Sequence, residues 1–159
     1  MFDYMEKECF NVKWKLVLVV GLLMILAACS SKEPRDINSA TDVCEVCNMS
    51  VSSEEHAAQI VMDNGDYTVF DDLGCLMEFM MDADASEIGG AFVKDASENK
   101  WLNIEKATYV YSEGNWTPMN YGVLAFDSKK SAENWIEKEG MGKLLSYDDL
   151  QGFEWGVHH

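Results

Sequence analysis

Two short, mostly apolar runs, separated by a polar turn, predict a β-hairpin. The runs are AAQIVM at residues 57–62 and YTVF at residues 67–70, with Asp63-Asn64-Gly65-Asp66 between them. Asn-Gly between two segments rich in β-branched and aromatic residues is the strongest short-range signal for a hairpin. We therefore expect two antiparallel strands joined by a tight turn.

The segment that follows changes to the period of an α-helix. Asp71 or Asp72, directly before it, has the short acidic side chain that is preferred at a helix N-cap. The apolar residues of the segment are spaced at i, i+3, i+4 and i+7, as Leu73, Leu76, Met77 and Met80. The first predicted unit is strand, strand, helix.

A second unit of the same kind is predicted towards the C-terminus. ATYVYS at 107–112 and GVLAF at 122–126 read as strands, and a helix runs from about Ser128 to Glu139. The segments YTVFDDLGCLMEF and VLAFDSKKSAENW align with Phe70-Asp71 over Phe126-Asp127. The alignment rests on few identities, but it indicates an internal repeat.

Two further short strands are predicted between these units, AFVKD at 91–95 and WLNIE at 101–105. The predicted fold class is therefore α+β, with two ββα halves, related as a pseudo-repeat, whose sheets pack against helices. We expect the folded domain to span residues 42–150 and a C-terminal tail to occupy residues 151–159.

The N-terminal region has the pattern of a lipoprotein signal peptide. LVLVVGLLMILAA at 16–28 carries no charge and follows three lysines. It is shorter than the ~20 apolar residues that span a bilayer, and it fits the apolar core of a signal peptide. The run ends in Leu26-Ala27-Ala28-Cys29, which resembles a lipobox. The sequence predicts a cleaved signal peptide at 1–28, an acylated Cys29 and a flexible tether over 29–41; the alternative is an ordinary secreted protein.

The charge balance excludes one class of partner. Cleavage after Ala28 would remove three lysines and three acidic residues, so the formal net charge of −16 belongs to the mature part of the chain. Such a surface repels nucleic acid and anionic lipid headgroups, and it attracts cations or basic partners. Nucleic-acid binding is therefore not expected.

Three sulfur side chains lie close together in CEVCNMS at 44–50. With Cys9 in the signal peptide and Cys29 acylated, an odd number of thiols remains, which favours a metal site or a reactive thiol over a disulfide scaffold. Cys44 and Cys47 form a C-x-x-C pair that alone is ambiguous among a zinc half-site, a redox pair and a local disulfide. Met49 adds a thioether, which favours Cu(I), because Zn(II) gains little from such a donor.

Other residues could complete such a site. Cys75 is predicted in the first turn of the first helix, as a third ligand, a reactive thiol or a small buried side chain. Met119, in the proline-marked segment TPMN, is either a thioether ligand or a capping hydrophobe. His56 is expected to be a solvated residue, and His158 with His159 is expected to lie in a disordered tail.

The motifs together resemble the nitrous oxide reductase accessory lipoprotein family, NosL, in its C-x-x-C-containing subgroup. The resemblance covers nearly all of residues 42–150 and rests on three segments: CEVCNMSVSSEEHAAQIVMDNGDYTVFDDLGC, WLNIEKATYV and TPMNYGVLAF. It implies a membrane-anchored Cu(I) chaperone, similar in fold to organomercurial lyase, that delivers copper for the copper-sulfide centre of nitrous oxide reductase.

Carried over by position, the resemblance implies that Cys47 is a thiolate ligand and Met119 a thioether ligand. Many members have Gly-His or Gly-Ala after that methionine, whereas this chain has Asn120-Tyr121. A histidine ligand at that place is therefore missing here. Cys44 and Cys75 remain candidates on chemical grounds.

The sequence therefore predicts an extracytoplasmic, lipid-anchored protein that binds Cu(I) without being an enzyme. Its expected partners are nitrous oxide reductase or its assembly apparatus, an ABC-type maturation transporter. Two alternatives stay open: a thiol-disulfide oxidoreductase that uses Cys44 and Cys47, and a structural lipoprotein in which these two cysteines form a disulfide. The oxidoreductase is disfavoured because the pair precedes a strand, whereas such enzymes place it at a helix N-terminus.

Overall fold

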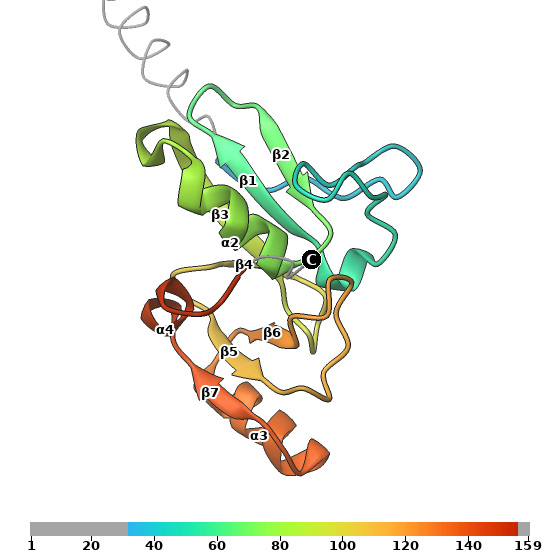
Figure 1. Ribbon diagram of the computed structural model, residues 1–159, viewed down its shortest axis with the longest axis vertical. Helices are drawn as coiled ribbons and strands as arrows, with labels where there is room; N and C mark the ends of the chain where they lie inside the picture. The colour runs from blue at the N-terminus through green and yellow to red at the C-terminus, as the bar shows by residue number, and fades with distance from the viewer. Residues whose placement is uncertain (1–31, 156–159) are drawn as a thin grey trace, which may run out of the picture. The chain divides into compact units, whose positions relative to one another are not determined.

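The computed structural model describes residues 32–155, which form two antiparallel sheets with helices packed against them (Figure 1). The first sheet has the strand order β2-β1-β3-β4 and the second has the order β6-β5-β7. Their strands are β1 (Ala58–Met62), β2 (Tyr67–Phe70), β3 (Ile88–Lys94), β4 (Trp101–Asn103), β5 (Thr108–Tyr111), β6 (Val123–Phe126) and β7 (Lys143–Leu145). The predicted α+β class is confirmed.

Three α-helices and two short 3₁₀ helices complete the described part of the chain. They are α2 (Leu73–Asp82), α3 (Lys129–Glu139), α4 (Tyr147–Gln151), η1 (Glu54–His56) and η2 (Ala85–Glu87). Within residues 32–155, none of the helices has the length and apolar character that crossing a bilayer requires.

The predicted first hairpin is confirmed, and its turn explains the register. β1 pairs with β2 so that Ala58 lies opposite Phe70. In the turn, the side chain of Asn64 accepts a hydrogen bond from the backbone N–H of Asp66, and Gly65 has φ of 91°. A residue with a Cβ atom is strained at this φ, so the Asn-Gly pair supplies what the turn needs.

The predicted first helix is also confirmed, and its N-cap is Asp72. The Asp72 carboxylate accepts a hydrogen bond from the backbone N–H of Cys75. α2 buries Leu73, Leu76 and Met77 against the first sheet, as the apolar spacing predicts. Because Asp72 is the N-cap, Asp71, which directly follows β2, has no capping role.

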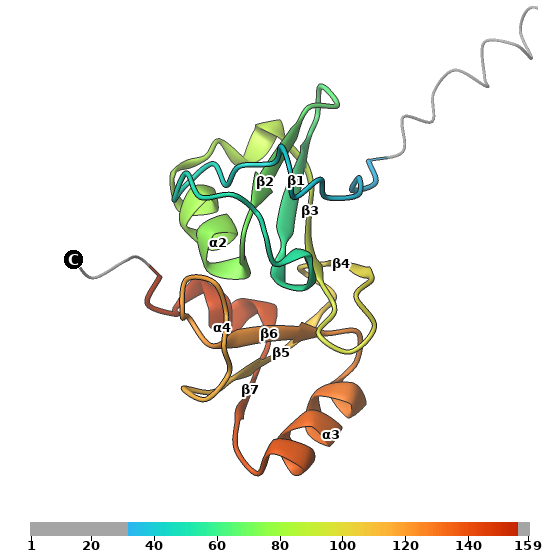
Figure 2. The same ribbon diagram turned by 90° about the vertical axis from the view of Figure 1, so that its right-hand side faces the viewer.

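The second half repeats the first, and the repeat is larger than predicted. β5 pairs with β6, and Ser128 caps α3 at the position that corresponds to Asp72. In addition, β3 pairs with the free side of β1, and β7 pairs with the free side of β5. Each half is therefore a ββαβ unit rather than ββα (Figure 2). The strand β7 was not predicted, because its three residues are too few to show a periodicity.

An aromatic pair joins strand to helix in the same way in both halves. Phe70 packs on Phe79 with ring centroids 5.3 Å apart, and Phe126 packs on Trp135 at 5.6 Å. Phe70 belongs to the larger buried cluster, which includes Cys44 and Cys75. Phe126 belongs to a smaller cluster with Val110, Leu124 and Ala132.

The segments at the two ends of the described part are tied to the domain. Near the N-terminal end, Arg35 forms a bidentate ion pair with Asp42, and the backbone N–H of Arg35 donates to the side chain of Gln59. Near the C-terminal end, the Trp155 indole donates to the carbonyl of Leu150. The predicted signal peptide, Cys29 and the last four residues lie outside the described residues.

Candidate metal centre

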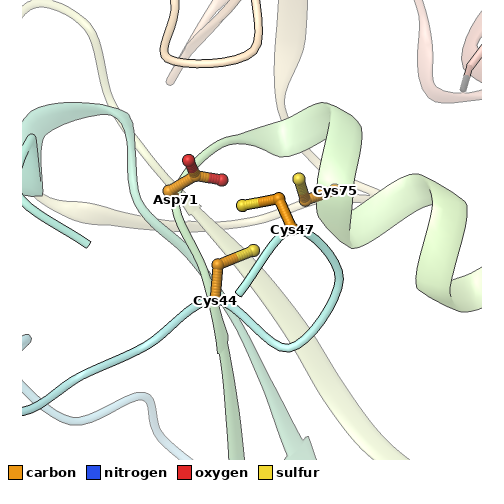
Figure 3. A group of neighbouring side chains, drawn as sticks. All are labelled: Cys44, Cys47, Asp71 and Cys75. Atoms are coloured by element: carbon orange, nitrogen blue, oxygen red, sulfur yellow. The ribbon is translucent and has the colours of Figure 1, made fainter. Parts of the chain in front are cut away.

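Four side chains from three parts of the first half converge on one point. They are Cys44 and Cys47 from the loop before η1, Asp71 from the end of β2, and Cys75 from the first turn of α2 (Figure 3). One ligand atom from each lies within 4.8 Å of the others. The three predicted cysteine ligands are thus neighbours, and all three are free thiols.

The loop at 44–50 folds back on itself, which brings its two cysteines to the same side. The backbone N–H of Cys44 donates to the carbonyl of Met49, and the N–H of Asn48 donates to the carbonyl of Cys44. Asn48 has φ of 59°, a left-handed conformation that asparagine tolerates better than most residues. A bridge between Val43 and Ser50 closes the loop at its base.

Backbone amides near the sulfur atoms of this loop favour ionisation. The N–H groups of Val46, Cys47 and Asp71 act to lower the pKa of Cys44, and that of Met49 acts to lower the pKa of Cys47. Hydrogen bonds to a charged group favour the charged form, and metal ions bind thiolate rather than thiol. The loop is therefore arranged to hold at least one thiolate.

The three thiols differ in acidity. A hydrogen bond from the Cys75 thiol, aided by the backbone amides, lowers the pKa of Cys44 to about 6 although burial opposes this shift. Burial raises the pKa of Cys47 to about 12. The pKa of Cys75 is raised because its thiol donates to Cys44 and because it is buried. Of the three thiols, Cys44 is thus the one that ionises most readily.

Asp71 is the member of the group that the sequence did not reveal as a site residue. Only 2% of its surface is exposed, and its Oδ1 atom is buried without a hydrogen-bond partner among the described residues. Buried polar atoms are rarely left unpaired, and such groups concentrate at functional sites. The sequence did not single out Asp71 as a site residue, because Asp71 and Asp72 could each serve as the N-cap of the predicted helix.

Met119 reaches the site from the second half through a backbone contact. It lies in the loop between β5 and β6, and its N–H donates to Asp72 Oδ2 at 3.0 Å. The other carboxylate oxygen of Asp72 caps α2 at Cys75, with an N···O distance of 3.1 Å. The half-buried Met119 side chain packs against the same cluster that contains Cys44 and Cys75. Burial raises the pKa of Asp72.

Two other predicted candidates lie at the periphery. The Met49 side chain is 46% exposed, although its backbone closes the cysteine loop. His56 lies in η1 and makes an edge-to-face contact with Trp116, and burial lowers its pKa. His56 does not belong to the four-donor group found among residues 32–155. His158 and His159 lie outside the described residues.

Comparisons with known proteins identify the family and the fold of the chain. A model of the NosL family matches residues 34–153. Among solved structures, the crystal structure of the copper chaperone NosL from Shewanella denitrificans superposes with a TM-score of 0.64 at 24% sequence identity, over 74% of this chain and 95% of that chain. No curated protein matches the sequence. Because the family model covers most of the chain, the protein belongs to the NosL family.

Proposed function

We propose that this protein binds Cu(I) through Cys44, Cys47, Cys75 and Met119, and passes it to an acceptor protein as a chaperone. The observation that carries the proposal is the convergence of three free thiols at a helix terminus to which the Met119 loop is tied. The Shewanella denitrificans protein of similar fold is a copper chaperone, which supports the choice of metal.

The donor set fits Cu(I) better than a hard cation. Thiolates and thioethers are soft ligands, and Cu(I) is the biological ion that prefers them most clearly. Cys44 and Cys75 are buried, whereas Cys47 is partly exposed. We infer that copper enters and leaves at Cys47, because an incoming ligand from an acceptor can reach that sulfur first.

The cellular setting of the proposal rests on the sequence. The lipobox at Leu26-Ala27-Ala28-Cys29 supports acylation of Cys29 and anchoring on the extracytoplasmic face of the membrane. The NosL resemblance supports nitrous oxide reductase, or its ABC-type assembly apparatus, as the acceptor. Replacing Cys29 by alanine should release the protein from the membrane fraction, and incorporation of labelled fatty acid into that variant would refute the anchor.

The geometry gives less support to a thiol-disulfide oxidoreductase. Cys44 and Cys47 lie in a turn that leads to η1, and neither is at the N-terminus of an α-helix of the described chain. The cysteine at a helix start is Cys75, whose pKa is raised. A nucleophilic cysteine needs a lowered pKa together with access to its substrate, and the buried Cys44 lacks that access.

A competition titration with a Cu(I) chelator tests the metal assignment. Cys47→Ala should weaken Cu(I) binding most, and Met119→Ala should weaken it less, because a thiolate binds Cu(I) more strongly than a thioether. Ligands of one ion should couple by ~0.5 to 3 kcal/mol in the double variant. Met81→Ala, at a methionine that is 70% exposed on α2, serves as the control and should change nothing.

Two outcomes of this titration count against the proposal. Unchanged affinity in Cys47→Ala would refute a copper site at the cysteine cluster. Strictly additive losses in the double variant would place Met119 at a different site, and the ligand set would then reduce to the three cysteines.

A further inference from the structure

We propose that Tyr121 is a positioning residue, which holds the loop between β5 and β6 closed over the start of α2 and thereby sets how fast metal leaves the centre. The part about metal release rests on the proposed function. The part about the closed loop rests only on the contacts of Tyr121 with α2 and with the C-terminal segment.

The residues around Met119 form one closed turn at 117–122. The backbone N–H of Asn120 donates to the carbonyl of Thr117 at 2.9 Å, and the N–H of Gly122 donates to the Thr117 hydroxyl at 3.3 Å. Asn120 and Gly122 have φ of 61° and 68°, which asparagine and glycine adopt more readily than other residues. Because the backbone of the turn is fixed in this way, a contact that holds one of its residues also holds Met119.

Two contacts fasten this turn to α2, beside which the loop lies (Figure 2). The first is the hydrogen bond from the Met119 N–H to the N-cap carboxylate of α2. The second is made by Tyr121, whose ring lies against Gly74 and whose hydroxyl donates to the Glu78 carboxylate. Gly74 and Glu78 lie on either side of Cys75 in the sequence of α2. The turn is therefore fastened to the part of the helix that carries a cysteine of the centre.

Gly74 makes room for the ring of Tyr121. A Cβ atom at Gly74 would overlap that ring, so the ring lies directly on the helix backbone. Glycine is unfavourable inside a helix, where alanine is the most favourable residue. Gly74 is not among the described glycines with positive φ, so no left-handed conformation requires it. The close approach of Tyr121 is thus the reason for a glycine at this position.

The C-terminal segment supports the same ring from the second half. Trp155 makes an edge-to-face contact with Tyr121, with ring centroids 5.3 Å apart and an interplanar angle of 70°. Trp155 is itself fixed, because it packs on Phe153 at 4.5 Å and its indole donates to the carbonyl of Leu150. Tyr121 therefore lies between α2 of the first half and the end of the second half, and it restrains the turn from both.

Loss of this restraint should affect both the thiols and the metal. Without the Tyr121 ring, only the Met119 N–H contact would join the turn to α2, and the turn could lift from Cys75, which is fully buried. A thioether binds Cu(I) less strongly than a thiolate, so we expect Met119 to leave the metal first. The hold of Tyr121 on the turn would then set the rate of that first step.

Alkylation of the thiols tests the closed loop without any metal. The full chain is purified in detergent, reduced and treated with iodoacetamide, and mass spectrometry gives the rate at Cys75. Tyr121→Ala should raise this rate ~10-fold, because it increases the population of a locally open state. Gly74→Ala should raise it similarly, since its methyl group displaces the ring although alanine favours the helix. The double variant should react no faster than Tyr121→Ala.

Trp116→Ala is the matched control for these variants. Trp116 is an exposed aromatic residue of the same loop, but it contacts His56 instead of α2. It should leave the alkylation rate of Cys75 unchanged. Tyr121→Phe keeps the ring on Gly74 and loses only the hydrogen bond to Glu78, so it should retain most of the protection.

The rate of Cu(I) release to an excess of chelator tests the consequence for the metal. Tyr121→Ala should speed release ~10-fold, in line with the increased opening of the loop. In the Met119→Ala background, Tyr121→Ala should cause no further increase, because both changes act through one ligand. A residue that only supports the fold would speed release in both backgrounds.

The outcomes separate this inference from the proposed function. Unchanged alkylation of Cys75 in Tyr121→Ala and Gly74→Ala overturns the inference even if the protein binds copper. An equal increase in Trp116→Ala overturns it too, as does faster release by Tyr121→Ala in the Met119→Ala background. If the protein binds no Cu(I), the copper proposal and the claim about metal release fail, whereas alkylation still decides whether Tyr121 closes the loop. Should Tyr121→Ala not fold, the comparison of Gly74→Ala with the wild type decides.

Discussion

The two ββαβ halves share one backbone design but use the junction between the second strand and the helix differently. In the first half, Asp71 is buried beside Cys75 under the cysteine loop. In the second half, Asp127 forms an ion pair with Lys100 and accepts a hydrogen bond from Ser131. The same pair of positions holds a carboxylate and a thiol in one half, and a carboxylate and a hydroxyl in the other.

The site therefore depends on the loop that covers the junction and on the side chains present there, rather than on the repeat itself. The loop at 44–50 covers the first junction and lies before β1, in a segment outside the repeated elements. The second half contributes instead through its longer loop between β5 and β6, which carries Met119 to Asp72. One half therefore supplies the thiols, and the other supplies the candidate thioether.

The largest effect should come from the buried phenylalanine at each junction. Phe70→Ala and Phe126→Ala should each destabilise the fold by about 3 to 5 kcal/mol, because both side chains are fully buried and pack on a helix aromatic. Only Phe70→Ala should also weaken Cu(I) binding, since Phe70 shares its cluster with Cys44 and Cys75. Urea unfolding gives the stabilities, and chelator competition at low temperature gives the affinities. Similar losses of Cu(I) affinity in both variants would contradict the assignment of the metal centre to the first half.

The helix caps should give a smaller effect that still differs between the halves. Ser128→Ala removes the cap of α3, which is worth about 1 kcal/mol, and with it the hydroxyl contact between Ser128 and Ser131. Asp72→Ala removes the cap of α2 and also the acceptor of the Met119 N–H, so a loss of about 2 to 3 kcal/mol is expected. Thermal unfolding of the metal-free variants measures both.

A serine at position 72 separates the two roles of the carboxylate. Ser128 shows that serine can cap the equivalent helix, but its single hydroxyl cannot also hold the Met119 loop. Asp72→Ser should therefore recover most of the stability while leaving Cu(I) affinity as low as in Met119→Ala. Full recovery of affinity in Asp72→Ser would show that the backbone contact does not position Met119.

The sequence predicted the elements whose signals are local. The Asn64-Gly65 turn, the helical spacing after Phe70 and the repeat of Phe-Asp each depend on neighbouring residues, and each is confirmed. The position of Cys75 in the first turn of α2 is confirmed for the same reason. Local periodicity was sufficient because these segments bury one face against a sheet.

Features that depend on contacts between distant parts of the chain could not be predicted from the sequence. The third strand of each half forms its ladder with a strand far away in the chain, and three residues at Lys143–Leu145 carry too little pattern to show it. Asp71 was not predicted as a site residue, because it becomes one through burial under the cysteine loop and not through its neighbours in the sequence. The ligand roles of Met119 and Met49 remain predictions.

The smallest expected effect has opposite signs in the two halves. In the metal-free protein, Asp71→Asn should raise stability by up to about 1 kcal/mol, because it removes the charge from a buried oxygen that has no partner among the described residues. Asp127→Asn should lower stability slightly, since it weakens contacts with Lys100 and Ser131 at the surface. Sites that bind ligands often keep such unfavourable groups at a cost in stability.

Thermal unfolding of the wild type, Asp71→Asn and Asp127→Asn in the absence of metal measures all three proteins under matched conditions. If Asp71→Asn is less stable than the wild type without metal, the carboxylate is satisfied within the protein, and its unpaired oxygen no longer points to a ligand.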